Sequence, residues 1–165
     1  METNKKLGFT LIEVLIVIGI LAILAGIVLV AINPGHQFAQ ARDTQRASAI
    51  HAILNAVGQN MAENRGIFTC NGVEKEILTS QDDNGLPTTV IKSGSSQGEI
   101  DLYDCLVPKY IAEMPIDPKD GHLKDKTDYN TGYYIGKTGA EEGNRIIIYA
   151  RSAEIDENIP MKVVR

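Results

Sequence analysis

The sequence predicts an α+β fold in which a long N-terminal helix packs on a small antiparallel β-sheet. A long apolar run near the N-terminus is followed by an amphipathic helical pattern that continues to about residue 63. Three short β-prone segments then lie close together in the last third of the chain. A length of 165 residues predicts about one globular domain in addition to the apolar run.

The apolar run is long enough to cross a membrane. Every residue from Val14 to Ile32 is apolar or glycine, which is close to the roughly 20 residues that a spanning helix needs. Lys5 and Lys6 lie just before the run, so the positive-inside rule keeps residues 1–8 in the cytoplasm. The remainder of the chain is then expected on the outer side of the membrane.

Glu13 is the residue that a plain membrane anchor does not explain. A charged group near the bilayer interior costs several kcal/mol and requires either a partner or access to water at the interface. An ordinary secretory signal peptide is disfavoured, because its apolar region has about 7 to 15 residues and residues 29–33 match its cleavage site poorly. A single-pass anchor and a leader that is cut before the apolar run remain as interpretations.

Residues 5–14, Lys-Lys-Leu-Gly-Phe-Thr-Leu-Ile-Glu-Val, resemble the class III signal sequence of type IV pilins and pseudopilins. The shared features are a short basic leader, glycine at its last position, phenylalanine at the first mature position and glutamate at the fifth. In that family a membrane prepilin peptidase cuts after the glycine and methylates the new N-terminal phenylalanine. The resemblance implies a pilin-like fold, cleavage between Gly8 and Phe9, and N-methylation of Phe9.

Cleavage would also supply a partner for Glu13. The new amine of Phe9 is a cation at the apolar end of a helix, about one turn from Glu13, so a pair within one helix is conceivable. In a staggered assembly the pair can instead join neighbouring chains, as the family's use of this glutamate implies. Breaking such a desolvated pair is penalised by roughly 3 to 5 kcal/mol. We therefore expect Glu13 and Phe9 to form an assembly contact.

The resemblance implies a structural subunit of a type IV pilus-like filament. The alternatives are a pseudopilin of a type II secretion system and a monomeric membrane-tethered binding domain. The implied partners are other copies of the chain, prepilin peptidase, the pilus or secretion assembly machinery, and the lipid bilayer before assembly. The expected location is the bacterial inner membrane, with the N-terminus in the cytoplasm, and then an extracellular pilus or a periplasmic pseudopilus.

Other functional classes find little support in the sequence. The formal net charge of −5 argues against nucleic acid as a general partner. His36, His51 and His122 are isolated from any metal-binding or nucleophile pattern, and we expect them to be surface or turn residues. No glycine-rich phosphate loop follows a strand. We therefore expect neither enzymatic activity nor a cofactor.

The predicted organisation is a leader at residues 1–8, an apolar helix at 9–32 and an exported domain at 33–165. Pro34 and Gly35 are expected to break the helix. After this break, one group of residues recurs at helical spacing and forms an apolar stripe expected to pack on the sheet: Ile50, Ile53, Leu54, Val57 and Met61. Other positions are expected on the remaining helix faces: Arg42, Asp43, Arg46 and Gln59. Residues 64–66, Asn-Arg-Gly, are expected to end the helix.

Three strands are predicted at Gly132–Lys137, Arg145–Ala150 and Met161–Val164, with a polar hairpin connection between the first two. Residues 69–98 are predicted to be mainly a surface connection with a short β-prone piece at residues 88–92. If the domain is exported, a disulfide between Cys70 and Cys105 would anchor this segment to the domain. Such a disulfide would stabilise the fold by roughly 3 to 4 kcal/mol. Two unpaired buried thiols are the alternative.

One acidic cluster is a candidate calcium site, because calcium prefers several oxygen ligands from a flexible loop. Its members are Asp117, Asp120, Asp125 and Asp128, and some pseudopilins bind calcium in this part of the domain. Three lysines interleave with these acids and the spacing fits no EF-hand loop. We therefore expect them to be ordinary turn residues.

Overall fold

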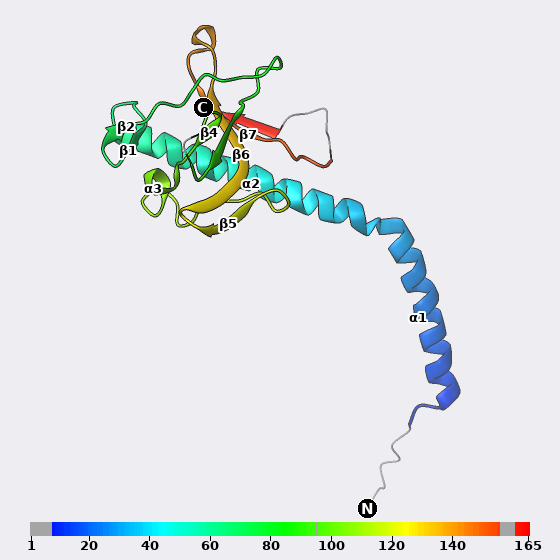
Figure 1. Cartoon of the computed structure of the whole chain (residues 1–165). Coiled ribbons are helices and arrows are strands. Elements are labelled where there is room, and N and C mark those ends of the chain that lie inside the picture. Colours follow the sequence, from blue (N-terminus) through cyan, green and yellow to red (C-terminus); the bar gives the residue numbers. More distant parts are fainter. Residues whose placement is uncertain (1–7, 95, 156–160) are drawn as a thin grey trace, which may run out of the picture. The chain divides into compact units, whose positions relative to one another are not determined.

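The structure, a computed structural model, describes residues 8–94, 96–155 and 161–165. It divides into two compact units, of which the first ends at Phe38 and the second runs from Ala39 to Arg165. The units are described separately here, with their elements labelled in Figure 1. Residues 1–7 of the expected leader lie outside the described residues.

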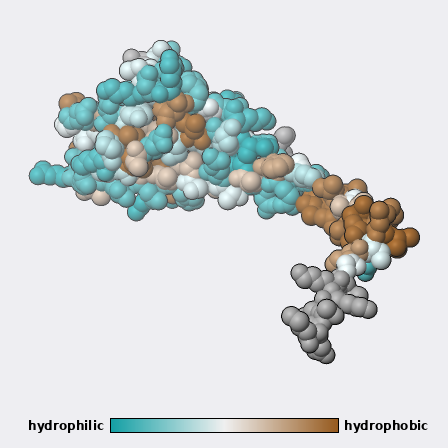
Figure 2. Space-filling view, turned by 90° about the horizontal axis from the view of Figure 1, so that it is seen from below, coloured by the Kyte–Doolittle hydropathy of each residue, from teal (hydrophilic) through white to brown (hydrophobic). Residues whose placement is uncertain are grey.

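The main element of the first unit is helix α1, Leu11–Ile32, whose side chains are all exposed. Its most apolar window has a mean hydropathy of 3.3, and the helix is long and apolar enough to cross a membrane. Figure 2 shows α1 as a continuous hydrophobic surface. Because α1 has apolar side chains on every face after its first turn, it requires lipid or other protein chains around it.

The helical path is interrupted at Asn33, which adopts the left-handed conformation with φ 45°. The expected helix break at Pro34 and Gly35 therefore lies one residue earlier, since these two residues begin helix α2, Pro34–Glu63. Proline is compatible with the first helical position, where its missing N–H is not needed, and it disfavours the helical conformation of the residue before it.

The second unit combines α2 with a six-stranded sheet. The strands are β3 (Thr89–Lys92), β4 (Glu99–Ile100), β5 (His122–Asp125), β6 (Asp128–Lys137), β7 (Ile146–Ala150) and β8 (Met161–Val164). Their order is β4-β3-β6-β7-β8, with β5 also paired to β6. The β3–β4 pair is parallel and the other pairs are antiparallel. The predicted α+β class is confirmed.

Smaller elements complete this unit. Strands β1 (Thr69–Cys70) and β2 (Val73–Glu74) form a separate hairpin, and α3 spans Tyr103–Leu106. A short 3-10 helix, η1 (Ala140–Glu142), lies in the β6–β7 connection. Cys70 of β1 and Cys105 of α3 form the expected disulfide, which ties the hairpin to the body of the domain.

The core lies between α2 and the sheet. The predicted stripe is buried on α2 from Ile50 to Val57, and Met61 is partly buried beside it. Inward-facing strand residues meet this stripe: Ile91, Tyr133, Ile135 and Ile148. Along β6, Tyr133 and Ile135 follow the two-residue period of a strand with one covered face.

The sheet is larger than the three predicted strands. The β-prone piece predicted at residues 88–92 is β3. The rest of residues 69–98 is more than a surface connection, because it contributes β1 and β2 and buries Ile77 and Leu86. These strands are short and separated by turn residues, so their own sequences carry little periodicity. Strand β6 also begins at Asp128 and runs through Gly132, which has a φ of 74° that glycine readily accepts.

Candidate functional site

Gly8 and Phe9, the predicted cleavage residues, lie just before α1 and outside the helix. Both residues are exposed, and Phe9 has 84% of its surface accessible. Thr10 has extended dihedral angles and is the N-cap of α1. The backbone between Gly8 and Phe9 is therefore accessible, as a protease substrate must be.

Glu13 forms a capping box with Thr10 at the start of α1. The Glu13 backbone N–H donates to Thr10 Oγ1 over 3.3 Å, and the Thr10 backbone N–H donates to Glu13 Oε2 over 3.4 Å. This box satisfies two backbone donors that the start of a helix leaves free. Thr10 was missed in the sequence analysis, although Thr-x-x-Glu before an apolar run is a recognised capping pattern.

The capping box gives Glu13 two hydrogen bonds but no positive charge. Among the described residues, no Lys, Arg or His side chain forms an ion pair with Glu13. In the uncut chain the Phe9 nitrogen belongs to a peptide bond, so it carries no charge either. Among the described residues, Glu13 therefore has hydrogen-bond partners but no charge partner.

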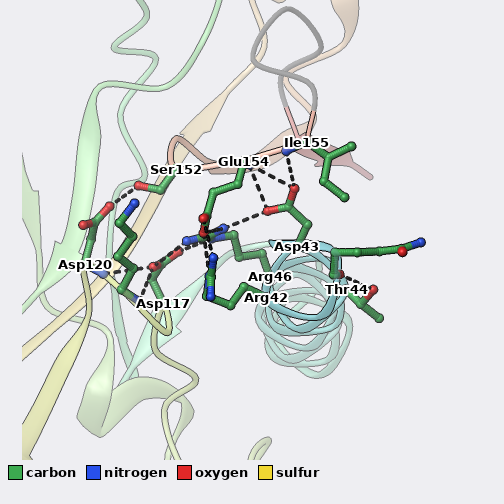
Figure 3. A network of polar contacts seen from close by, with 11 residues as sticks. Arg42, Asp43, Thr44, Arg46, Asp117, Asp120, Ser152, Glu154 and Ile155 are labelled. Carbon is green, nitrogen blue, oxygen red and sulfur yellow. Dashed lines mark hydrogen bonds and ion pairs between the residues drawn. The ribbon is translucent and has the colours of Figure 1, made fainter. Parts of the chain in front are cut away.

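A second polar feature lies inside the second unit, where Arg46 of α2 is fully buried (Figure 3). Its Nε donates to Asp117 Oδ2 over 2.7 Å, and its Nη1 donates to Asp43 Oδ1 over 2.7 Å and to Glu154 Oε1 over 2.8 Å. Arg42 pairs with Glu154 from the rim of the cluster. We refer to Arg42, Asp43, Arg46, Asp117 and Glu154 as the Arg46 cluster.

The Arg46 cluster joins three parts of the domain. Asp43 accepts hydrogen bonds from the backbone N–H groups of Glu154 and Ile155, which fixes the segment after β7 against α2. Asp117 Oδ1 accepts from the backbone N–H groups of Lys119 and Asp120, which fixes the turn before β5. The cluster therefore has a structural role in the fold of the second unit.

The backbone around Asp117 is packed too closely for larger residues. A Cβ atom on Gly121 would lie 2.6 Å from the Asp117 nitrogen, and one on Gly132 would lie 2.8 Å from the Asp117 Cβ atom. These two glycines allow the turn and β6 to enclose the carboxylate. Asp117 is 1% exposed as a result.

The charges of the cluster perturb one another. Burial raises the pKa of Asp117, but hydrogen bonds from Arg46 and the turn amides outweigh burial and lower the pKa below its usual value. Hydrogen bonds from Arg42 and Arg46 lower the pKa of Glu154 to about 2. Burial lowers the pKa of Arg46, but its three carboxylate partners raise it overall. All of these groups are charged at neutral pH.

The placement of Asp43 and Arg46 corrects the sequence analysis, which put them on faces of the helix away from the apolar stripe. Both are buried, at 8% and 0% exposure. They continue the stripe toward the N-terminus of α2 at the same spacing of three and four residues. The structure buries them because each obtains an opposite charge, which is the condition under which charged side chains enter an interior.

The four calcium candidates do not converge. Asp117 binds Arg46, Asp120 contacts Ser152, Asp125 accepts from the Thr127 N–H, and Asp128 pairs with Lys124 and His122. No group of three or more His, Cys, Asp or Glu side chains within the described ranges is arranged to hold a metal ion. Asp117 also differs from the expected ordinary turn residue, because it is buried and ion-paired.

The three histidines are exposed, as expected. His36 and His51 lie on α2, and His122 begins β5. The hydroxyl group of Tyr129 donates to Asp101 Oδ1 over 2.8 Å and accepts from the Leu102 N–H over 3.0 Å. These contacts give Tyr129 a structural position in the domain.

Comparison with known families gives one match. The prokaryotic N-terminal methylation motif matches residues 3–29, a range that includes Gly8, Phe9, Thr10 and Glu13. No curated protein and no solved structure shows significant similarity to the chain. The chain thus carries, at its N-terminus, the class III signal that marks type IV pilins and pseudopilins for prepilin processing.

Proposed function

We propose that the chain is a structural subunit of a type IV pilus-like filament. In this proposal the precursor is held in the inner membrane by α1 and is cut between Gly8 and Phe9 by prepilin peptidase. The same enzyme methylates the Phe9 amine. Processed chains then leave the membrane and assemble through their α1 helices, while the second unit forms the outer part of the filament.

The observation that carries the proposal is the combination of an uncovered α1 with an acid in its first turn. All 22 residues of α1 are exposed, so removal from lipid would require other chains to cover them. Relative to exposure to water, association of several such helices gains roughly 25 cal/mol per Å² of apolar surface covered. Apolar contacts alone do little to fix how far one α1 helix is shifted along its neighbour. Glu13 can fix this axial register.

Two observations support this register role of Glu13: its position, and the fact that no described residue forms an ion pair with it. It lies one turn from the nitrogen that processing would turn into a cation. Once helices surround α1, an uncompensated carboxylate would be strongly unfavourable. Packing in which Glu13 meets a neighbour's Phe9 amine is therefore preferred over packing that shifts the helices by a turn.

A type II secretion pseudopilin remains the second candidate, since it uses the same processing signal and the same helix. A monomeric tether accounts for α1 but gives Glu13 no role beyond the capping box. The three candidates differ in the product that they yield. A pilin yields long surface fibres, a pseudopilin yields short periplasmic assemblies, and a tether stays monomeric in the membrane.

The test is electron microscopy of fibres sheared from cells that express the chain, together with mass spectrometry of the processed N-terminus. We expect fibres that contain the chain, with an N-methylated Phe9 as its first residue. Glu13→Ala should be processed but should yield no fibres, whereas Val14→Ala, a neighbouring apolar change, should retain them. Fibres of normal abundance from Glu13→Ala would contradict the proposed register role, and a wild-type chain that is processed but monomeric would favour the tether.

A further inference from the structure

A hollow of about 550 Å³ lies in the second unit where the C-terminal end of α2, the β1–β2 hairpin and the α3 region meet. Polar side chains from all three parts line it, among them Asn64, Asn71 and Asp104. Its volume is within the range of roughly 300 to 1,000 Å³ that is usual for small-molecule sites. The hollow is lined by none of the residues assigned to processing, to assembly or to the Arg46 cluster.

The walls of the hollow are held in place by bonds within the domain. The disulfide between Cys70 and Cys105 joins the hairpin to α3. The Asn60 side chain donates to the Thr69 carbonyl oxygen over 2.8 Å and accepts from the Thr69 N–H over 2.9 Å, which joins the hairpin to α2. A ligand that enters a site with fixed walls loses little affinity to ordering the protein.

An ion pair lies at the rim of the hollow. The Glu63 carboxylate accepts hydrogen bonds from Lys109 Nζ over 2.7 Å and from the Tyr110 hydroxyl over 3.0 Å. Both charged side chains are largely exposed, so the pair adds little rigidity. It places a negative charge beside Lys109, which leaves the rim without an unpaired lysine at this point.

Several hydrogen-bonding groups that line the hollow are not used elsewhere. Within the described residues, no hydrogen bond engages the Asn71 amide, the Thr69 hydroxyl or the Asn64 Oδ1 atom. The Asp104 carboxylate has only a long, exposed pair with Lys126 Nζ at 3.6 Å. Amide groups both donate and accept, and a carboxylate only accepts, so these groups together can serve a ligand that has many hydroxyl groups.

The chemistry of the hollow favours an uncharged ligand. An anion would meet Asp104 and would find Lys109 already paired with Glu63. An apolar ligand would leave the amide and hydroxyl groups without partners, which is unfavourable when they lose water. Val107 and Pro108 add apolar surface that can contact the C–H groups of a sugar ring. We propose that this hollow binds an uncharged saccharide.

The proposal is tested with the full chain, purified in a detergent whose headgroup is not a sugar. An array of neutral oligosaccharides identifies a ligand, and isothermal titration calorimetry measures its affinity. Asn71→Gly removes the side-chain amide. Glycine readily adopts the backbone conformation of Asn71, whose φ is 51°. We expect it to weaken binding about tenfold, the effect of losing one or two hydrogen bonds. Asp104→Asn, which removes the charge and replaces one of the two acceptor oxygens by an NH2 donor, should weaken binding similarly.

Asn84→Gly is the matched control, because Asn84 is also an exposed residue in an Asn-Gly turn but lies outside the hollow. It should bind the saccharide as the wild-type chain does. Absence of saccharide binding on the array would overturn the proposal, and so would equal affinity of Asn71→Gly and Asn84→Gly. Neither measurement depends on a filament, so a failure here and a failure to form fibres are distinguishable.

Discussion

Glu13 and Asp117 are two carboxylates that are compensated in different ways. Asp117 receives the guanidinium of Arg46 from the same chain and is enclosed by two close glycines. Glu13 has a capping hydrogen bond but no positive partner among the described residues. The comparison indicates that the Arg46 cluster serves the fold of the second unit, whereas Glu13 is the acid that we propose to pair with another chain.

The largest expected effect on stability is that of Arg46→Ala. It leaves three carboxylates without their shared cation, and we expect it to lower the free energy of unfolding by roughly 3 to 5 kcal/mol. All six tyrosines lie after residue 100, so near-ultraviolet circular dichroism of the full chain in detergent reports on the second unit. Arg46→Lys should lose less, because it keeps the charge but not the planar geometry. Unfolding of Arg46→Ala at the wild-type temperature would show that the cluster does not hold the fold.

Acid should weaken the same cluster. The folded-state pKa values of Asp43, Asp117 and Glu154 are all lowered. The stabilisation of the fold by these carboxylates is therefore fully present above their unfolded-state pKa values, which are near 4. It is lost as the pH falls through the folded-state pKa values. For Glu154 this window runs from about 4.5 down to about 2. Thermal unfolding between pH 6 and pH 2 should show the loss, and Arg46→Ala should show a shallower pH dependence.

Arg42→Ala should have a smaller effect than Arg46→Ala. Arg42 also pairs with Glu154, but its side chain is 36% exposed, so water replaces much of what is lost. The same unfolding measurement ranks the two variants. An effect as large as that of Arg46→Ala would show that burial is not what distinguishes the two arginines.

Calcium should change the domain little. Asp117 is occupied by Arg46 and by two backbone amides, so a metal ion at that carboxylate would first have to displace a buried guanidinium. Titration of the full chain with calcium should give no heat of binding beyond dilution. Saturable uptake that Asp117→Asn abolishes would refute this prediction and would support the calcium site considered from the sequence.

Glu13→Ala should have the smallest effect on stability, within about 0.5 kcal/mol for the second unit. Glu13 lies in the first unit, and among the described residues its side chain hydrogen-bonds to Thr10 alone. The tyrosine signal should therefore unfold at the wild-type temperature. A marked shift would mean that Glu13 contributes to the fold and would remove the contrast with Asp117.

The sequence predicted the parts of the molecule that local pattern determines. Continuous hydropathy predicted α1, the spacing of Ile50, Ile53 and Val57 predicted the buried face of α2, and β-prone composition predicted β7 and β8 to within one residue at each end. The N-terminal signal was evident because its residues are adjacent in the chain. The same holds for Thr10, which the capping pattern could have identified.

The long-range contacts of the second unit could not be predicted in this way. Arg46 and Asp117 are 71 residues apart, and no local pattern pairs them. The two-residue strand β4 has no periodicity of its own, yet it pairs in parallel with β3. A usable signal did exist for Asp43 and Arg46, since they occupy stripe positions, but charge alone placed them on the wrong face.

The most direct test of the contrast is the structure of the assembled filament at side-chain resolution. The account predicts that a carboxylate oxygen of Glu13 lies within about 4 Å of the Phe9 amine of a neighbouring chain, while the Arg46 cluster keeps its partners within each chain. A Glu13 that bonds only to Thr10 of its own chain, or that faces water, would contradict the account.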